Sequence, residues 1–447
     1  MLEVCRYPAE PPSPRLLAIL GRRAGVADEV SDTVREILRQ VRRDGDRALS
    51  ELTRRLDGAE IPPGRFRVPV AELRVAASRI DPDLRAAVQA AVANVRAFHL
   101  HQRQTSWFVE DGDGVILGKK VVPIQRVGIC VPAGEVPLFS SLVMAAVPAQ
   151  VAGVPEVCVV SPPKADGLPH PTILAVCDLL GIEEVYAVGG AQAVGALAFG
   201  TESIRAVDLV VGPGSPYTVA AQQQVFGTVG VALLPGPSEI AVLADAGADP
   251  VLIAADLLSQ AEHGWGVASV CLTPSALLAE QVAAEVERQL ASLPRAEVVR
   301  QALEAFGAVV VVPDLETGLE LLNRMAPEHV ELLVADPWSL LDQVHHAGAV
   351  FLGPASTEPV GDYFAGTNHI LPTNGAARFA SSLGVADFVR SSSIVAYTPR
   401  RLERTAGQIA RLARAEGLEA HARAVLARVP AASSDTNATE QADRSAP

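Results

Sequence analysis

Four short segments in the second half of the chain carry residue types that bind metals or transfer protons. In the first of them, residues 256–263, the apolar spacing predicts a helix. Gln260 and His263 share one face of this helix because they are three residues apart. A polar pair of this kind more often marks a solvated face than a metal site, so this segment alone leaves both interpretations open.

The second segment, residues 326–332, places an acid next to an imidazole. Pro327 ends the preceding helix, and Glu328 and His329 follow where a strand is predicted to begin. An adjacent carboxyl group and imidazole at the edge of a sheet can serve as general acid and base. A turn with exposed charges contains the same residue types, and both interpretations are kept at this point.

The remaining two segments add further candidate ligands. Residues 361–369 form a polar run in which Asp362 is a candidate hard-oxygen ligand and His369 a candidate ligand or a partner of one. The glycines of this run indicate that the backbone approaches another group closely. The last segment lies in a helical C-terminal region, where His421 follows Glu416 by five positions.

The composition bounds the classes of protein to which these segments could belong. Of the 447 residues, 49% are hydrophobic and only 4% aromatic, which favours helices packed on parallel strands over a β-sandwich. The formal net charge of -14 argues against a nucleic-acid partner, which would need clustered Lys and Arg. We find no leader and no apolar run of about 18 residues, so we expect a cytoplasmic protein without a membrane span.

Short apolar strands alternate with helices through the middle and later parts of the chain. This β-α-β-α order is typical of parallel, doubly wound sheets. Two separate runs predict two Rossmann-like, duplicated α/β domains with helical N- and C-terminal extensions. The predicted strands are 157–160, 184–188 and 208–211 in the first run, and 268–272, 308–312, 330–334 and 349–352 in the second.

The signal for a nucleotide cofactor is weak. No strand runs into Gly-x-Gly-x-x-Gly, and the nearest pieces are Gly189-Gly190 and Gly212-Pro213-Gly214, each directly after a predicted strand. Ligands of such sheets bind beyond the carboxyl ends of the strands. Glycines after strands often serve only tight turns, so the residues alone leave a nucleotide site open.

Taken together, the chain from about residue 34 to residue 428 resembles the histidinol dehydrogenase family. Long and chemically unusual strings occur in the family's order, and as a set they are highly specific. They are RVGICVPAG (126–134), GGAQAVGALAFGTESI (189–204), VGPGS (211–215), GPSE (236–239), AADLLSQAEHG (254–264), APEHVEL (326–332), GDYFAGTNHILPT (361–373) and AEGLEAH (415–421).

The resemblance implies a zinc site. In the family, the corresponding side chains bind one zinc ion per subunit, which positions the amine and imidazole of the substrate. The implied ligands are Gln260, His263, Asp362 and His421. This set of nitrogen and oxygen ligands makes a hard site without a thiolate.

The resemblance also implies the reaction, a four-electron oxidation of L-histidinol to L-histidine through L-histidinaldehyde, with NAD as acceptor. This is the last step of histidine biosynthesis. His329 would take the alcohol proton in each hydride transfer, and Glu328 would activate water to hydrate the aldehyde. Substrate contacts are implied for Ser238, Gln260, His263, His329, Asp362, Glu416 and His421, and cofactor contacts for Gln192 and Ser215.

The same resemblance predicts a homodimer with shared active sites, in which Glu416 reaches into the site of the partner subunit. We expect an N-terminal arm over 1–25 and a first Rossmann-like domain, with most of the zinc site, formed by 26–127 plus 239–380. A second Rossmann-like domain on the NAD side would span 128–238. A C-terminal helical dimer arm over 381–430 and a disordered tail over 431–447 would follow.

The chain departs from the family pattern on the cofactor side. Cys130 stands where Tyr is usual, Ala133 where Gly is usual, and Ser215 where Asn is usual. Ser215 keeps a hydroxyl for hydrogen bonding, whereas Cys130 lacks the phenol. Two alternatives therefore stay open. One is a related zinc and NAD dehydrogenase for another polar alcohol, such as a hydroxysulfonate; the other is a zinc hydrolase that uses Glu328 without NAD.

Overall fold

The computed structural model describes the chain except for residues 1, 10, 24, 26, 134–135 and 430–447. The disordered tail expected at 431–447 therefore lies outside the described residues. The chain divides into two units, the first Met1–Arg103 with Pro123–Arg390 and the second Gln104–Val122 with Ser391–Pro447. Among the described residues, no helix is both long enough and apolar enough to cross a membrane.

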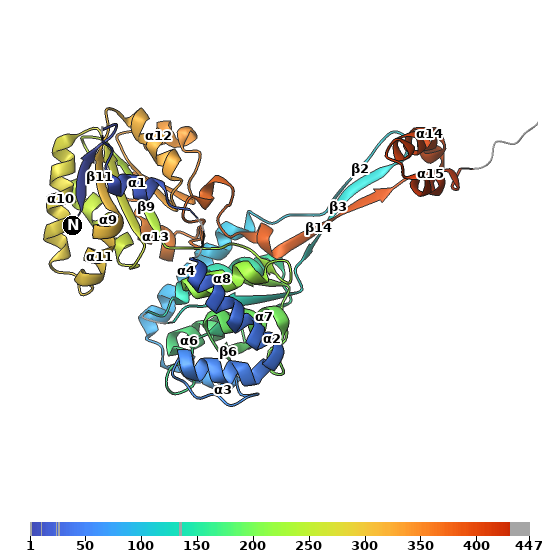
Figure 1. The fold of residues 1–447 in the computed structure, drawn as a ribbon, viewed down its shortest axis with the longest axis horizontal. Helices are drawn as coiled ribbons and strands as arrows, with labels where there is room; N and C mark the ends of the chain where they lie inside the picture. The colour runs from blue at the N-terminus through green and yellow to red at the C-terminus, as the bar shows by residue number, and fades with distance from the viewer. Residues whose placement is uncertain (1, 10, 24, 26, 134–135, 430–447) are drawn as a thin grey trace, which may run out of the picture. The chain divides into compact units, whose positions relative to one another are not determined.

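The first unit contains a six-stranded parallel sheet (Figure 1). Its strands, in spatial order, are β1 (Glu3–Arg6), β11 (Gly307–Val311), β10 (Ala268–Thr273), β9 (Glu239–Ala244), β12 (His329–Leu333) and β13 (Ala349–Leu352). Its helical elements are α1 (Pro14–Leu20), α9 (Pro250–Ala261), α10 (Ala276–Leu290), α11 (Ala296–Phe306), α12 (Leu315–Met325), η1 (Pro337–Gln343) and α13 (Glu358–Tyr363).

Helices cover both faces of this sheet because successive side chains of a strand point to opposite sides. Ile240 and Val242 of β9 pack in one apolar cluster with α9, α10 and α11. Ala241 and Leu243 pack in another with α1 and α12. Burial on both faces explains why these strands read as continuous apolar runs, and it agrees with the expected doubly wound arrangement.

A second, five-stranded parallel sheet lies in the same unit. Its strands, in spatial order, are β6 (Val185–Ala187), β5 (Glu156–Ser161), β4 (Arg126–Cys130), β7 (Leu209–Val211) and β8 (Gly230–Val231). Its connecting helices are α5 (Phe139–Ala152), α6 (Pro171–Leu179), α7 (Gly190–Phe199) and α8 (Pro216–Val225), and the later turns η2 (Ala376–Arg378) and η3 (Val385–Phe388) follow.

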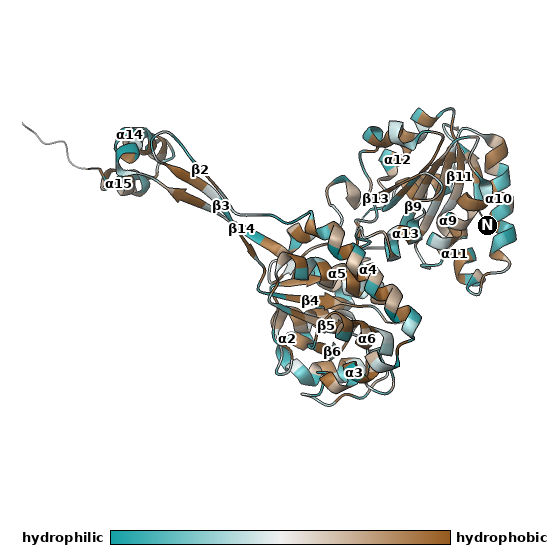
Figure 2. Cartoon of the chain, turned by 180° about the vertical axis from the view of Figure 1, so that it is seen from behind, coloured by the Kyte–Doolittle hydropathy of each residue, from teal (hydrophilic) through white to brown (hydrophobic). Residues whose placement is uncertain are grey.

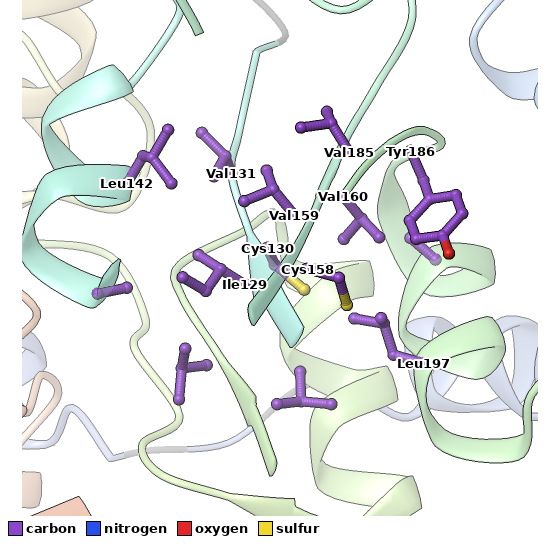
Figure 3. Close-up of a cluster of buried hydrophobic side chains, with 14 of the residues drawn as sticks. Ile129, Cys130, Val131, Leu142, Cys158, Val159, Val160, Val185, Tyr186 and Leu197 are labelled. Atoms are coloured by element: carbon purple, nitrogen blue, oxygen red, sulfur yellow. The ribbon is translucent and has the colours of Figure 1, made fainter. Parts of the chain in front are cut away.

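The core of this sheet is apolar throughout. Figure 2 shows β4 and β5 in the brown of hydrophobic residues. Close up, the buried thiols of Cys130 and Cys158 lie among Ile129, Val159 and Leu197 (Figure 3). These two cysteines therefore pack as small hydrophobic residues.

The long helices near the N-terminus differ from the expected domain plan. Residues 26–127 were expected to join the later sheet, but α2 (Asp28–Leu56), α3 (Val70–Arg79) and α4 (Pro82–Leu100) share their apolar cluster with the five-stranded sheet. Val34 and Leu38 of α2, for example, are buried in the same cluster as Leu197 of α7. An amphipathic pattern reveals that a helix has a buried face, but not which sheet covers it.

The second unit is built from a three-stranded sheet and two helices. The sheet has the order β14 (Val389–Ala396), β3 (Ile116–Pro123) and β2 (Trp107–Glu110), and β2 and β3 pair antiparallel. Helices α14 (Pro399–Ala415) and α15 (Glu419–Leu426) pack against each other. Several large apolar side chains of this unit are exposed, among them Trp107, Phe108 and Leu412.

Candidate active site and metal centre

Five of the predicted site residues line one cavity of about 100 Å³, namely Ser238, His263, Glu328, His329 and Asp362. Glu328 directly precedes β12 and His329 is its first residue, while Ser238 directly precedes β9. The reacting groups therefore lie at the amino ends of the strands of the six-stranded sheet. Ligands of such sheets usually bind at the carboxyl ends of the strands. Pro213, which follows β7 of the other sheet, lines the same cavity.

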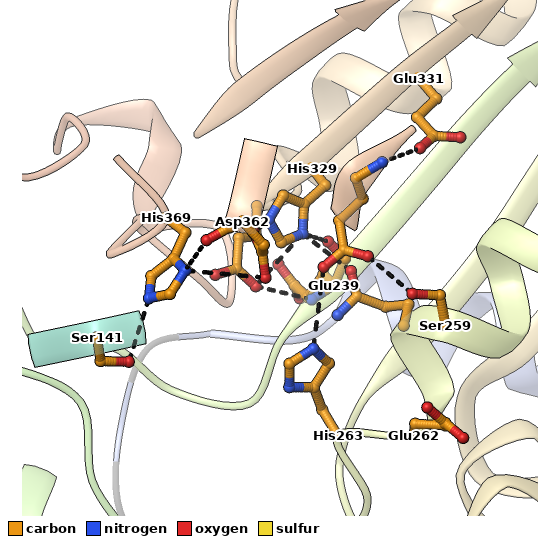
Figure 4. A network of polar contacts seen from close by, with 12 residues as sticks. Ser141, Glu239, Ser259, Glu262, His263, His329, Glu331, Asp362 and His369 are labelled. Atoms are coloured by element: carbon orange, nitrogen blue, oxygen red, sulfur yellow. Dashed lines mark hydrogen bonds and ion pairs between the residues drawn. The ribbon is translucent and has the colours of Figure 1, made fainter. Parts of the chain in front are cut away.

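The hydrogen bonds of His329 define its tautomer (Figure 4). Its Nδ1 lies 2.9 Å from Oε1 of Gln260 and 3.2 Å from the carbonyl oxygen of Glu239. Because both partners are acceptors, Nδ1 carries the proton and Nε2 is left with its lone pair. Nε2 lies 3.8 Å from Oδ1 of Asp362 and has no hydrogen-bond partner among the described residues.

Burial also keeps this imidazole neutral, because it lowers the pKa of His329 to about 4. At neutral pH, His329 is therefore a proton acceptor in this cavity. The adjacent Glu328 is buried as well, and Oε2 of its carboxyl group accepts the backbone N–H of Glu239 at 3.1 Å. Burial raises the pKa of Glu328 well above its usual range, so this carboxyl group is a stronger base than a solvated one.

A cluster of potential metal ligands lies beside the acid/base pair. Potential ligand atoms of His263, Glu358 and Asp362 all lie within 4.8 Å of one another. Oε1 of Glu358 is 3.9 Å from Nε2 of His263, and its Oε2 accepts the hydroxyl of Ser259 at 3.0 Å. Burial opposes ionisation of Glu358, but the contacts with His263 and His329 lower the pKa of this carboxyl group to about 2.

The structure brings His263 and Asp362 together as expected and adds Glu358, which the sequence analysis missed. One signal could have found it: Glu358 precedes Asp362 by four residues on α13, so both project from one helix face. Gln260 sits in the last turn of α9, fully buried. Its amide oxygen faces His329, and its Nε2 has no hydrogen-bond partner among the described residues.

His369 acts in the structure as a partner that orients Asp362. Its Nδ1 lies 2.9 Å from the backbone oxygen of Asp362, and its Nε2 lies 3.1 Å from the hydroxyl of Ser141 on α5. Nδ1 must donate to the carbonyl, so Nε2 accepts from Ser141. The imidazole thereby links the six-stranded sheet's site to a helix of the five-stranded sheet (Figure 4).

Behind the cluster lies a second pair of buried acids, Asp256 and Glu331. Glu331 accepts the backbone N–H of Glu358 at 2.8 Å, and Asp256 accepts the hydroxyl of Thr357. Burial and the hydrogen-bonded Asp256 raise the pKa of Glu331 to about 9, so the two carboxyl groups share a proton at neutral pH. Together they hold the start of α13, from which Glu358 projects.

The two predicted cofactor contacts lie around another cavity, of about 230 Å³, at the carboxyl ends of the five-stranded sheet. Ser215 lines it and caps the N-terminus of α8. Gln192, in the first turn of α7, is buried and donates through Nε2 to Asp57 at 3.2 Å. Cys130 also lines this cavity, and burial raises the pKa of its thiol to about 12.

The last two predicted site residues belong to the second unit. Glu416 caps the C-terminus of α14, and His421 lies in α15. Both side chains are exposed within that unit. Their roles as substrate contact and zinc ligand stay predictions.

Comparisons with known proteins agree with this geometry. Residues 20–429 match the family model described as histidinol dehydrogenase. The histidinol dehydrogenase of Halalkalibacterium halodurans is 48% identical over 89% of this chain and 93% of its own length. That of Nitratidesulfovibrio vulgaris is 49% identical over 93% and 96%. A crystal structure of histidinol dehydrogenase from Elizabethkingia anophelis superimposes with a TM-score of 0.89 at 35% identity, covering 96% of this chain and 98% of that one. The resemblance, the α/β fold class and the expected oxidoreductase class are thereby confirmed.

Proposed function

This chain belongs to the histidinol dehydrogenase family, and from that premise we propose that it oxidises L-histidinol to L-histidine through L-histidinaldehyde, with NAD and a zinc ion. The observation that carries the proposal is the buried pair of Glu328 and His329. Nε2 of His329 is unprotonated and lies beside Asp362 in a cavity that His263 also lines. An oxidation from alcohol to acid needs a proton acceptor and a group that activates water, and this pair supplies both.

The residues present fit a zinc ion. Asp362 and Glu358 are two buried carboxylates in one cluster with the imidazole of His263, and a cation would offset their mutual repulsion. The donors are nitrogen and oxygen atoms, a set that zinc accepts. We assign His263, Asp362, Gln260 and, from a second copy, His421 as the residues that hold the ion. When bound, zinc supplies a Lewis acid that fixes the amine and imidazole of the substrate.

The chain's own residues perform the proton transfers. In the first oxidation, Nε2 of His329 takes the alcohol proton while hydride leaves for NAD. The Nδ1–H, held by Gln260 and the carbonyl of Glu239, keeps the ring in the tautomer that can accept it. In the second stage, Glu328 removes a proton from water as it adds to the aldehyde. His329 returns the proton that it took from the alcohol to the aldehyde oxygen, which completes the hydrate. The ring, neutral again, then takes a proton of the hydrate in the second hydride transfer.

The cavity at the carboxyl ends of β4, β5, β6 and β7 fits the dinucleotide. The N-termini of α7 and α8 open onto it at Gly189, Gly190 and Ser215, where backbone N–H groups can bind a pyrophosphate. A Cβ on Gly189 would come within 2.6 Å of Pro162, and Gly190 has a φ of +64°, so both positions favour glycine. Oε1 of the buried Gln192 has no hydrogen-bond partner among the described residues and could accept one from a ligand.

A homodimer with shared sites is supported by the surface of the second unit. Trp107 and Phe108 of β2 and Leu412 of α14 are at least half exposed, at 52%, 58% and 70%. Exposed apolar side chains gathered on one small unit are typical of surfaces that pair with another chain. The same unit carries Glu416 and His421, so pairing with a second copy would allow these residues to reach the partner's site.

One assay tests the proposal. The purified protein with zinc should form NADH from L-histidinol and from L-histidinaldehyde, and two NADH should appear for each histidinol converted. NADH formation from a hydroxysulfonate, but not from histidinol, would instead identify a related dehydrogenase. Hydrolysis of an ester or amide without any NADH formation would contradict the proposal and favour the zinc hydrolase.

A further inference from the structure

We propose that Asp57 makes this enzyme select NAD over NADP, because its carboxylate lies where the 2′-phosphate of NADP would bind. The inference rests on the proposed binding of NAD in the cavity at the carboxyl ends of the five-stranded sheet. Asp57 caps the C-terminus of α2 and lines this cavity together with Gly189, Gly190 and Pro162.

Two sets of contacts show beside which strand of the five-stranded sheet Asp57 lies. Gln192, in the first turn of the helix α7 that follows β6, donates to its Oδ2 at 3.2 Å. The segment that follows Asp57 returns along the same strand, because Val68 donates its backbone N–H to Val185 and Ala187 donates to Phe66, each at 2.9 Å or less. Asp57 therefore lies at the β6 side of the cavity.

The opposite side of the cavity leads to the reacting groups. Pro213, which follows β7, lines both this cavity and the one that contains His329. The nicotinamide must face His329, so the nicotinamide end belongs near Pro213 and the adenosine end extends toward β6. The sheet order β6-β5-β4-β7 separates the two sides by three strand spacings, or about 14 Å.

The charges around the cavity favour an unphosphorylated ribose. Of the described residues that line it, Asp57 is the only one with a charged side chain, and none is lysine or arginine. A carboxylate accepts hydrogen bonds from the 2′- and 3′-hydroxyls of a ribose, whereas a 2′-phosphate needs a cationic partner such as arginine. With NADP, the phosphate would instead meet a like charge in a partly buried place.

The hydrogen bond from Gln192 suits Asp57 to the binding of ribose hydroxyls. Burial raises the pKa of Asp57 to about 6, while the hydrogen bond from Gln192 opposes that shift. The carboxylate is therefore ionised above this pH, and Gln192 fixes its orientation. One oxygen is held by the amide and the other is left for the ribose.

Direct binding of the cofactors and their fragments to the full-length zinc enzyme tests the proposal. Dissociation constants for NAD, NADP, 5′-AMP, 2′,5′-ADP and nicotinamide mononucleotide are measured by calorimetry at a pH well above 6, where Asp57 is ionised. The unaltered enzyme should bind NAD more tightly than NADP. In Asp57→Asn, the ratio of the dissociation constant for NADP to that for NAD should fall by about tenfold. This is the usual effect on affinity of removing one contact between charges.

The fragments locate the effect. Asp57→Asn should improve binding of 2′,5′-ADP and leave nicotinamide mononucleotide unchanged. Asp57→Glu should keep the preference for NAD, and Glu60→Gln, which removes an exposed charge three residues away, should have no effect. Equal melting temperatures of the variants verify that the fold is intact.

Three results would overturn the inference: an unchanged ratio of NADP to NAD in Asp57→Asn, an effect on nicotinamide mononucleotide in place of 2′,5′-ADP, or an equal effect of Glu60→Gln. If the unaltered enzyme binds neither cofactor and forms no NADH, the proposed function itself fails. That outcome is distinct from an enzyme that uses NAD but discriminates without Asp57.

Discussion

The backbone of Glu239 holds Glu328 in place: its N–H donates to Oε2 of Glu328 at 3.1 Å, and its carbonyl oxygen lies 3.2 Å from Nδ1 of the neighbouring His329. The main-chain N–H and C=O of one residue thus orient both members of the acid/base pair. The carboxylate of Glu239 is itself fixed, since it accepts Nε–H of Arg22 at 2.8 Å and the backbone N–H of Asn374 at 3.0 Å. An arginine just after α1 therefore supports the reacting groups without touching the cavity that they line.

Arg22→Met should lower kcat for histidinol by about tenfold or more, because a small displacement of catalytic groups is costly. The KM should change less, since Arg22 does not line the substrate cavity. The melting temperature should also fall, because Glu239 loses its buried partner. Arg23→Met, at an exposed neighbour, is the control. A normal kcat in Arg22→Met, alongside a lower melting temperature, would assign Arg22 to stability alone.

Glu328 and His329 should affect different half-reactions. His329→Asn should slow the oxidation of histidinol most strongly, because it removes the acceptor of the alcohol proton. Glu328→Gln should slow the oxidation of supplied histidinaldehyde most strongly, because hydration loses its base. Each loss should be about 10²–10⁴-fold, as is usual for general acid/base groups. Equal slowing of both half-reactions by Glu328→Gln, with no effect of His329→Asn, would contradict this division of labour.

The zinc content of variants should distinguish the proposed zinc ligands from the residue that only orients a ligand. His263→Ala and Asp362→Ala should each lose tightly bound zinc, because each removes a proposed ligand that alanine cannot replace. Glu358→Gln should weaken zinc binding by about 10–100-fold, the effect of losing a group that orients a ligand. Glu262→Gln, next to His263 but turned away from the cluster in Figure 4, is the control. Full zinc by elemental analysis in His263→Ala would refute the assignment.

Complementation should reveal a shared site. Glu328→Gln and His421→Ala are each expected to be inactive as pure homodimers. If His421 serves the site of the partner subunit, a mixed dimer contains one site with both residues intact. After the subunits exchange, activity should therefore recover, up to the level expected for one working site in each mixed dimer. A mixture that exchanges subunits and recovers no activity would show that each site is formed by one chain.

The buried acids behind the cluster should make stability depend on pH. Burial and Asp256 raise the folded-state pKa of Glu331 to about 9, above an unfolded value of about 4.3. This raised pKa stabilises the fold fully below the unfolded value, and the contribution is lost as pH rises through about 9. Glutamine resembles the protonated form of Glu331. In Glu331→Gln the melting temperature should therefore fall less between pH 5 and pH 9 than in the unaltered protein. The melting temperatures are measured with a chelator present. The exposed Glu320→Gln should leave the slope unchanged, and an equal slope in Glu331→Gln would refute the shared proton.

The sequence predicted the features that depend only on residues close to one another along the chain. A strand over 330–334 was expected from an apolar run after Pro327, and β12 spans His329–Leu333. Asp362 and His369 were singled out within one polar run, and they are hydrogen-bonded to each other. In both cases the chemistry and the secondary structure are encoded within a few positions, so a local pattern is sufficient.

The tertiary structure alone decided which distant residues meet. A single carboxylate such as Glu358 or Asp57 resembles a solvated charge in the sequence, and only burial beside His263 or Gln192 distinguishes it. The same holds for the helices at 28–100, whose apolar faces match either sheet until packing selects one. Apolar burial has no directional preference, so the sequence determined which surfaces are buried, and the packed structure determined what each of them contacts.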